Sequence, residues 1–353
     1  MPLPLPNLTS SRHPVSDHCD GRRFFNPAGL PPAGLKAIWD WRRSADPAAW
    51  PERFESPFPP DAPPERVTGE RLRLSHIGHS GNLLQTAGVN VLVDPHFSAR
   101  CSPSQRFGPM RHAEPGIAFA ALPPIDVVLV SHSHYDHMDR ATLTRLHDDH
   151  RPRFVVPLGV DRIVRGWRRK ARIEAYDWHE RAELGEKLSV TLWPAHHWSA
   201  RGVFDRRKTL WASFALQTPA GFVFHAGDTG FNAGRDFAAA REAFGPAALA
   251  VLPIGAYEPR AIMKPQHQEP DEAVRAARLL EAALAVGVHW GYWQLTDEAI
   301  DDPLRRLEAA LSRWSHPPER FVAARPGMVV ELPAAIDAAA TVRLVREDAQ
   351  AAG

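Results

Sequence analysis

The chain has 353 residues, of which 44% are hydrophobic and 24% are charged, and its formal net charge is +1. These values are typical of a globular protein with one large or two smaller domains, and the balanced charge argues against a nucleic-acid-binding protein. Its two cysteines, Cys19 and Cys101, argue against a disulfide framework and a thiolate zinc site. Because no run of 18 apolar residues occurs and prolines interrupt the N-terminus, we expect a cytoplasmic protein without a signal peptide.

The first 66 residues are rich in proline and contain one predicted helix, over residues 34–49. Prolines between residues 51 and 64 then indicate an extended connector. Tryptophan and phenylalanine side chains in this region need burial. We therefore predict that residues 1–66 form a Pro-rich N-terminal arm packed on the main domain.

The main catalytic domain is predicted to cover residues 67–332, and its elements alternate along the chain. Strands are predicted over residues 71–77, 90–94, 125–130, 154–156, 188–193, 210–217, 222–224, 249–254 and 285–288, and helices over 140–147, 233–244, 270–283 and 300–313. Early hairpins followed by mixed strands and helices predict an α/β fold with two sheets sandwiched between helices. Residues 333–353 form an Ala-rich, polar C-terminal tail that we expect to be partly disordered.

One short segment combines three imidazoles and a carboxylate. It reads His132-Ser133-His134-Tyr135-Asp136-His137 and directly follows the apolar strand at 125–130. Core packing does not require such residues, whereas neutral imidazole and carboxylate are good ligands for Zn²⁺ and similar ions. This segment therefore predicts a divalent metal site.

Further candidate ligands follow other predicted strands. His197, Asp228 and His289 each lie where a strand gives way to a loop, as the first cluster does. Open α/β sheets place their ligand sites at such strand ends, so we expect these residues to complete the site. His196 competes with His197, and we expect His225 to pack within its strand.

These residues, in this order, resemble the ligand pattern of the metallo-β-lactamase superfamily. Narrower motifs resemble N-acyl phosphatidylethanolamine-hydrolysing phospholipase D and its bacterial relatives. They are Ser102-Pro103-Ser104-Gln105 with Gly108-Pro109, Leu122-Pro123-Pro124-Ile125-Asp126, Ala226-Gly227-Asp228-Thr229-Gly230, Pro253–Arg260 and His289-Trp290-Gly291. The resemblance covers roughly residues 71–330. Ser133 and Met110 depart from the subgroup pattern, so the resemblance implies the fold and the metal site but not the exact lipid.

The resemblance implies an αβ/βα sandwich of two mixed sheets that holds two Zn²⁺ ions per chain. It assigns one zinc to His132, His134 and His197, the second to Asp136, His137 and His289, and Asp228 to both as a bridge. It further implies that a hydroxide between the metals attacks phosphorus, that Asp136 orients this hydroxide, and that His267 faces the substrate phosphate. Di-iron relatives usually have Glu at the position of His134, which favours zinc over iron.

Other polar residues lie close to these motifs in the sequence. Tyr257 and Arg260 are candidates for substrate binding, and Arg260 could either bind phosphate or form an ion pair with Glu258. His79 and Asp94 lie at strand ends, where we expect them to support the ligands or to pack rather than to bind metal.

The leading hypothesis is a zinc-dependent phosphodiesterase of phospholipase D type that acts on N-acyl phosphatidylethanolamine-like phospholipids or a related small phosphodiester. A metal-dependent lactonase or other small-molecule hydrolase of the same superfamily, and a non-catalytic metal-binding protein, are the alternatives. Basic residues in 162–172 could contact an anionic membrane, and those in 201–211 could line the substrate entrance. We expect no nucleic-acid partner, whereas peripheral membrane contact and a homodimer stay open.

Overall fold

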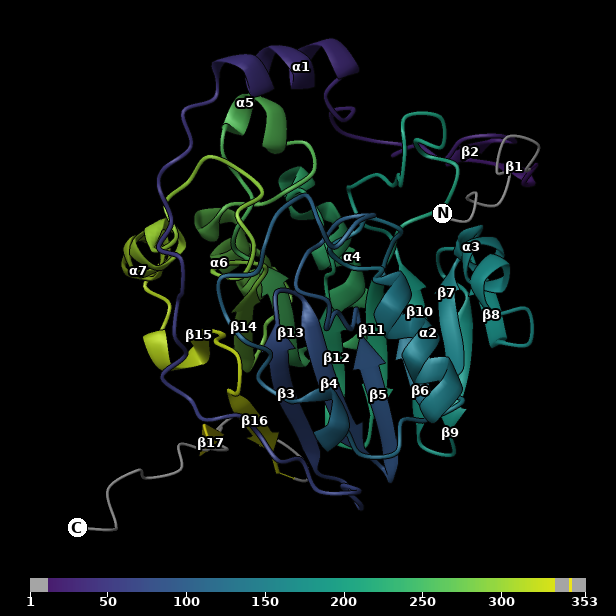
Figure 1. The fold of residues 1–353 in the computed structure, drawn as a ribbon. Coiled ribbons are helices and arrows are strands. Elements are labelled where there is room, and N and C mark those ends of the chain that lie inside the picture. Colours follow the sequence, from purple (N-terminus) through teal and green to yellow (C-terminus); the bar gives the residue numbers. More distant parts are fainter. Residues whose placement is uncertain (1–11, 334–342, 345–353) are drawn as a thin grey trace.

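The computed structural model describes residues 12–333 and 343–344, which form two sheets packed face to face (Figure 1). Within these residues one sheet has eight strands, the other has seven, and a two-stranded hairpin of β1 (Val15–Ser16) and β2 (Cys19–Asp20) lies near the N-terminus. The two-sheet sandwich predicted from the sequence is confirmed.

The eight-stranded sheet has the strand order β17-β16-β3-β4-β5-β6-β7-β8. Its strands are β3 (Leu72–Gly78), β4 (Gly81–Thr86), β5 (Val89–Val93), β6 (Val127–Leu129), β7 (Arg153–Pro157), β8 (Arg172–Tyr176), β16 (Val329–Leu332) and β17 (Arg343–Leu344). Strands β3, β4 and β5 form an antiparallel meander, and β5 to β8 run parallel. Strands β3, β5 and β6 therefore all end at the same edge of this sheet.

The seven-stranded sheet has the order β15-β14-β13-β12-β11-β10-β9. Its strands are β9 (Arg181–Gly185), β10 (Leu188–Trp193), β11 (Ser213–Thr218), β12 (Gly221–His225), β13 (Ala247–Pro253), β14 (Leu284–Val288) and β15 (Phe321–Ala323). Strands β12 to β15 run parallel, and β10 shares their direction because it is separated from β12 by the antiparallel β11. The ends of β10, β12 and β14 consequently lie at one edge.

Seven α-helices occur in the described residues, and five of them cover the outer faces of the two sheets. The seven are α1 (Leu35–Ser44), α2 (Arg140–Asp149), α3 (Val160–Trp167), α4 (Arg235–Phe244), α5 (Arg260–Met263), α6 (Pro270–Leu279) and α7 (Asp302–Arg313), with the short 3₁₀ turns η2 (Phe119–Ala121), η3 (Asn232–Gly234) and η4 (Pro318–Arg320). Apolar side chains of α2 and α3 pack on the eight-stranded sheet, and those of α4, α6 and α7 pack on the seven-stranded sheet. Each of these five helices thereby buries its apolar face against a sheet, whereas α1 and α5 lie beyond the strand ends (Figure 1).

The apolar alternation along the strands determines which face each side chain takes. Leu249 and Val251 of β13 enter the core between the sheets, whereas Ala250 and Leu252 pack toward the helices. The same alternation places Val91 of β5 between the sheets. Successive side chains of a strand point to opposite faces, so a strand buried on both faces is continuously apolar.

The predicted helices and strands are present in the structure, but several further strands were not predicted. All five predicted helices are present, and α6 begins with a capping box of Glu269 and Glu272 around Pro270. Strands β4, β8, β9, β15 and β16 were not predicted. Of these, β8 and β9 are edge strands on which charged, exposed residues interrupt the apolar pattern, a composition that prevents further strand pairing.

The described part of the N-terminal arm contacts the main body through aromatic side chains. The indole N–H of Trp41 donates to the carboxylate of Asp297 (2.7 Å), and that of Trp50 donates to the carbonyl of Glu298 (2.9 Å). The domain boundaries at residues 66 and 332 stay a prediction, and most of the predicted tail lies outside the described residues. No helix in the described residues has the length and apolar character needed to cross a membrane.

Candidate metal centre

All seven predicted ligands meet at the edge of the sandwich where β6, β10, β12 and β14 end. They form several overlapping groups, and within each group the possible ligand atoms lie within 4.8 Å of one another. Besides the seven predicted residues, the groups include His79 and His267. The predicted residues are His132, His134, Asp136, His137, His197, Asp228 and His289. These residues come from both sheets. The centre therefore forms only when the two sheets pack together.

The loop that carries four of these ligands is tightly held. It leaves β6 and turns back so that the N–H of Met138 donates to the carbonyl of His134 (2.8 Å). Asp139 then caps α2 by accepting hydrogen bonds from the first backbone N–H groups of that helix. The guanidinium of Arg201 donates to the carbonyls of Ser133 (3.0 Å) and Met138 (2.8 Å) and lies over the Tyr135 ring. Both ends of the ligand loop are thereby fixed.

Three imidazoles form the first ligand group. His134 Nδ1 lies 2.9 Å from His132 Nε2 and 3.2 Å from His197 Nε2. The other ring nitrogen of His197 donates to the carbonyl of Gln266 at 2.9 Å, which leaves Nε2 as the atom free to bind metal. With metal–nitrogen bonds of about 2.0–2.1 Å, ligand atoms around one zinc lie roughly 3–4 Å apart, so this spacing fits a single ion.

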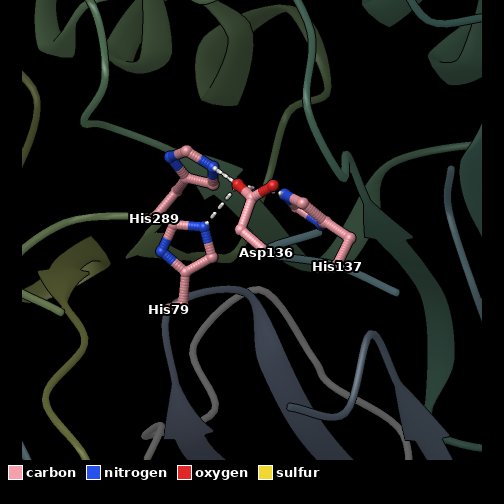
Figure 2. Close-up of side chains that lie close together, drawn as sticks. All are labelled: His79, Asp136, His137 and His289. Carbon is pink, nitrogen blue, oxygen red and sulfur yellow. Dashed lines mark hydrogen bonds and ion pairs between the residues drawn. The ribbon is translucent and has the colours of Figure 1, made fainter. Parts of the chain in front are cut away.

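The second group is centred on the carboxylate of Asp136 (Figure 2). Its Oδ2 lies 3.4 Å from Nε2 of both His137 and His289, and 3.0 Å from Nε2 of His79. Figure 2 shows these side chains converging on the carboxylate from different segments of the chain. Three imidazoles and one carboxylate suit a second divalent ion.

Asp228 lies between the two groups. Its Oδ2 is 3.8 Å from Nε2 of both His132 and His197, while Oδ2 and Oδ1 lie 3.1 Å from His137 Nε2 and His289 Nε2, respectively. One carboxylate thus contacts both groups. The bridging role that the resemblance implied for Asp228 stays a prediction.

A buried carboxylate behind the centre orients His137. Asp94 accepts hydrogen bonds from His137 Nδ1 (2.8 Å) and from both the N–H and the hydroxyl of Ser131 (2.7 and 2.6 Å). The contact directs His137 Nε2 toward the centre. Asp94, His79 and His289 all have positive φ, a costly conformation for residues with a Cβ that is often found at functional sites.

The unsatisfied polar atoms of the centre fit bound metal. Nε2 of His137, Nε2 of His289 and Oδ1 of Asp228 are buried and make no hydrogen bond among the described residues, although the imidazoles lie at ion-pair distance from Asp228. Leaving such an atom unpaired costs roughly 1–3 kcal/mol, so three converging examples need an explanation. Two divalent cations held by these residues would satisfy all three atoms.

Burial sets the charge of the imidazoles. It lowers the pKa of His134 to about 3 and that of His197 to about 4, so both are neutral and able to coordinate metal at neutral pH. Burial also opposes protonation of His289. The negative charge of Asp228 and hydrogen bonds to Asp136 and Asp228 outweigh the effect of burial and raise the pKa of His289 to about 9.

Comparison with known proteins identifies the family. Residues 89–290 match the model of the beta-lactamase superfamily domain. The chain is a member of the metallo-β-lactamase superfamily. Proteins of this superfamily include metal-dependent hydrolases, and the convergence of the His and Asp side chains accords with a divalent metal site.

Several relatives share most of the domain. An uncharacterised protein of Mycobacterium tuberculosis is 41% identical over 249 residues, which are 69% of this chain and 65% of that protein, slightly less than two thirds of its length. The N-acyl-phosphatidylethanolamine-hydrolyzing phospholipase D 1 of Caenorhabditis elegans is 34% identical over 241 residues, covering 66% of this chain and 67% of that protein. Igni18, a metallo hydrolase of Ignicoccus hospitalis, shares the fold, with a TM-score of 0.55, 20% identity and coverage of 74% of this chain and 99% of its own.

In this superfamily member the predicted substrate residues occupy different surroundings. His267 is buried within the group that also contains His197 and Asp228, and its Nδ1 has no hydrogen-bond partner among the described residues. Tyr257 is fully buried and donates its hydroxyl to Asp302 of α7 (2.6 Å). It has a partner within the fold, and its predicted contact with substrate stays a prediction.

The guanidinium of Arg260 forms an ion pair with Glu272 and not with Glu258, the partner considered in the sequence analysis. Its guanidinium pairs with Glu272 (2.7 Å) and donates to the carbonyl of His267 (2.9 Å), whereas Glu258 accepts from the backbone N–H of Arg260. Arg260 thus supports the backbone of His267. Direct binding of phosphate by Arg260 stays a prediction.

The structure also separates neighbouring histidines. His197 enters the cluster, while His196 Nε2 contacts the carbonyl of Leu30 (3.0 Å). His225 Nε2 lies 3.2 Å from the side-chain amide of Asn82. The sequence analysis expected His79 to support the ligands, yet its Nε2 lies within hydrogen-bond distance of the Asp136 carboxylate. Its position directly after β3, which ends at the same sheet edge as β6, is the sequence signal that could have placed it in the centre.

Proposed function

We propose that this chain is a zinc-dependent phosphodiesterase of phospholipase D type that hydrolyses N-acyl phosphatidylethanolamine or a closely related phospholipid. The observation that carries the proposal is the shared carboxylate of Asp228 between two groups of imidazoles, with His267 beside it. Such an arrangement suits two cations on either side of one phosphate. The name of the nematode relative supports the choice of substrate class.

When bound, two divalent metals polarise phosphoryl oxygens and lower the pKa of coordinated water, which provides hydrolysis without a serine or cysteine nucleophile. His132, His134 and His197 would hold one ion, Asp136, His137 and His289 the other, and Asp228 both. The three-imidazole group favours zinc over harder ions. Asp136, which reaches His79, His137 and His289, is the residue proposed to orient the attacking water.

His267 is the chain's own candidate for contact with the phosphate. Burial lowers its pKa well below the usual value, so the ring is neutral and can donate one N–H to a phosphoryl oxygen. Its ring centroid lies 5.1 Å from that of His197 and 5.4 Å from that of His289, which places it beside both ligand groups. Removing this donor would weaken binding of the transition state more than binding of metal.

One preparation of the full chain tests the proposal. We expect about two zinc ions per chain by elemental analysis. The same sample should hydrolyse an N-acyl phosphatidylethanolamine and an aryl phosphodiester, and should leave a lactone intact. The matched inactive control is Asp228→Ala, which should lose turnover and metal while its circular dichroism spectrum stays that of the wild type.

Three results would contradict the proposal. Turnover of the lactone alone would indicate a lactonase built on the same site. Full activity in a metal-free sample would exclude the metal-dependent chemistry. Stoichiometric zinc without turnover of any of the three substrates would indicate a non-catalytic metal-binding protein.

A further inference from the structure

Three basic segments that are far apart in the sequence form one surface. They are residues 12–33 of the arm, residues 160–172 with α3, and residues 198–211 between β10 and β11, together called the basic face. The backbone N–H of Phe24 donates to the carbonyl of Arg207 (2.8 Å), and the guanidinium of Arg162 contacts the carbonyl of Arg12 (3.4 Å). Figure 1 shows the loop after β10 beside the β1–β2 hairpin and above α3.

Charge is strongly concentrated on this face. The three segments contain 13 Lys and Arg residues and four Asp residues, a net charge of +9, in a chain whose total is +1. Two of the acidic residues, Asp20 and Asp205, are engaged within their own turns, where they accept hydrogen bonds from backbone N–H groups. The balanced charge of the whole sequence therefore conceals one cationic face.

Apolar side chains project from the same face. Val203 is 70% exposed and Phe204 is 82% exposed, at the tip of the loop between β10 and β11. Val15 and Leu30 are also exposed, so four of the eight large hydrophobic residues exposed in the described chain lie on these three segments. Exposed apolar side chains gathered on one face mark a site that another apolar phase can cover.

The basic face adjoins the metal centre directly. At the base of the loop the ring of Trp198 packs edge-on against His134, with centroids 4.6 Å apart. Arg201 of the same loop holds the carbonyls of Ser133 and Met138, and its guanidinium also lies 5.1 Å from the ring centre of Trp167 in α3. A surface that covers the basic face would therefore lie next to the ligand loop.

We propose that the basic face docks on an anionic lipid bilayer, with Val203 and Phe204 inserted at the boundary between headgroups and acyl chains. Cationic side chains match anionic headgroups, and the apolar tip requires a phase that a nucleic acid does not offer. The proposal goes beyond the proposed function, because docking needs no turnover and can be measured on protein that hydrolyses nothing.

Vesicle co-sedimentation of the full chain tests the docking. We expect binding to vesicles of phosphatidylcholine with about one third phosphatidylglycerol, and weak binding to pure phosphatidylcholine, because each Lys or Arg near an anionic surface contributes to affinity. Val203→Ser/Phe204→Ser should reduce the partition coefficient about tenfold or more. Arg169→Glu/Lys170→Glu should reduce it to a similar extent and weaken its dependence on salt.

Two variants outside the three segments provide matched controls. Lys187→Glu changes an exposed cation in the β9–β10 turn, and Leu279→Ala removes a partly exposed apolar side chain at the end of α6. Both should bind vesicles as the wild type does. Turnover of a water-soluble aryl phosphodiester should stay unchanged in all four variants, and zinc content serves as the readout if the protein has no such activity.

The docking proposal is overturned if the wild type ignores anionic vesicles, or if the Val203/Phe204 variant binds them as tightly as the wild type. Binding of an oligonucleotide in preference to anionic vesicles would likewise overturn it. Vesicle binding without turnover of any phosphodiester would support the docking and contradict the proposed function. The two proposals can thus fail separately.

Discussion

Individual ionisable residues show how burial decides charge in this protein. Around the centre, burial keeps most imidazoles neutral, while the carboxylates of Asp136 and Asp228 stay ionised beside His137 and His289. Away from the centre, burial raises the pKa of Asp236 to about 6, because the hydrogen bond from Asn232 and the charge of Arg235 offset it only in part. Asp236 lies in the first turn of α4, where the helix dipole favours a negative charge by only about 0.3–1 kcal/mol. Burial is the larger effect.

Asp236→Asn should therefore stabilise the protein at neutral pH. The folded pKa lies above the unfolded value of 3.8, so the folded state holds the proton more tightly and wild-type stability falls as pH rises from about 4 to 6. The asparagine does not titrate, so its advantage in free energy of unfolding should grow over this range and reach about 1–3 kcal/mol at pH 7. Urea unfolding at pH 4, 5, 6 and 7 measures this difference, and a constant difference across the series would contradict the assignment.

At the scale of elements, the predicted ligands lie on loops at the strand ends, and the loop after β10 supports the loop after β6. The segment after β10 brings His197 into the first group and then places Arg201, only 8% exposed, against the ligand loop after β6. The carbonyls that Arg201 binds follow His132 and His137, so a single guanidinium supports both ligand groups. Thr209 adds a hydrogen bond to the hydroxyl of Ser133 (3.1 Å).

Arg201→Ala should loosen the ligand loop. Two buried carbonyls would lose their donor, at a cost of about 1–3 kcal/mol each. We expect zinc affinity, measured by competition with a chelator, to fall about tenfold or more. Arg201→Lys keeps the charge and one donor and should recover part of the affinity. Arg165→Ala on α3 is the control, because its guanidinium donates to the carbonyl of Ile173 (2.7 Å) and not to the ligand loop. Unchanged zinc affinity in Arg201→Ala would show that the loop does not depend on this clamp.

At the scale of the whole molecule, the centre joins the two sheets. His79 and the ligand loop belong to the eight-stranded sheet, whereas His197, Asp228 and His289 follow strands of the seven-stranded sheet. Bound metal would therefore crosslink the two halves of the sandwich. Ligands that bind only the folded state stabilise it by mass action.

Metal removal should consequently lower the unfolding temperature. A metal present at about 1,000 times its dissociation constant contributes about 4 kcal/mol, which corresponds to a shift on the order of 5–15 °C. Scanning calorimetry of zinc-loaded and chelator-treated protein measures the shift. The unfolding temperature of Asp228→Ala should not respond to zinc, and an equal response in this variant and the wild type would place the stabilising metal elsewhere.

Much of the candidate site was predictable because its information is local. The spacing of His132, His134, Asp136 and His137 lies within one loop, and the apolar runs before His197, Asp228 and His289 mark strand ends that share one direction. The helices were predictable for the same reason. Edge strands β8 and β9 were missed because their pattern is interrupted by charge, and only pairing with a neighbour makes them strands.

The sequence by itself determined the apolar alternation, the positions of the strand ends and the residue types able to hold metal. The tertiary structure alone decided that His79 reaches Asp136 and that Arg201 braces the ligand loop. It also brought three separate basic segments onto one face. The physical reason is that periodicity and capping act between neighbours in sequence, whereas contacts between loops depend on strand order and on how the two sheets pack, which no local pattern encodes.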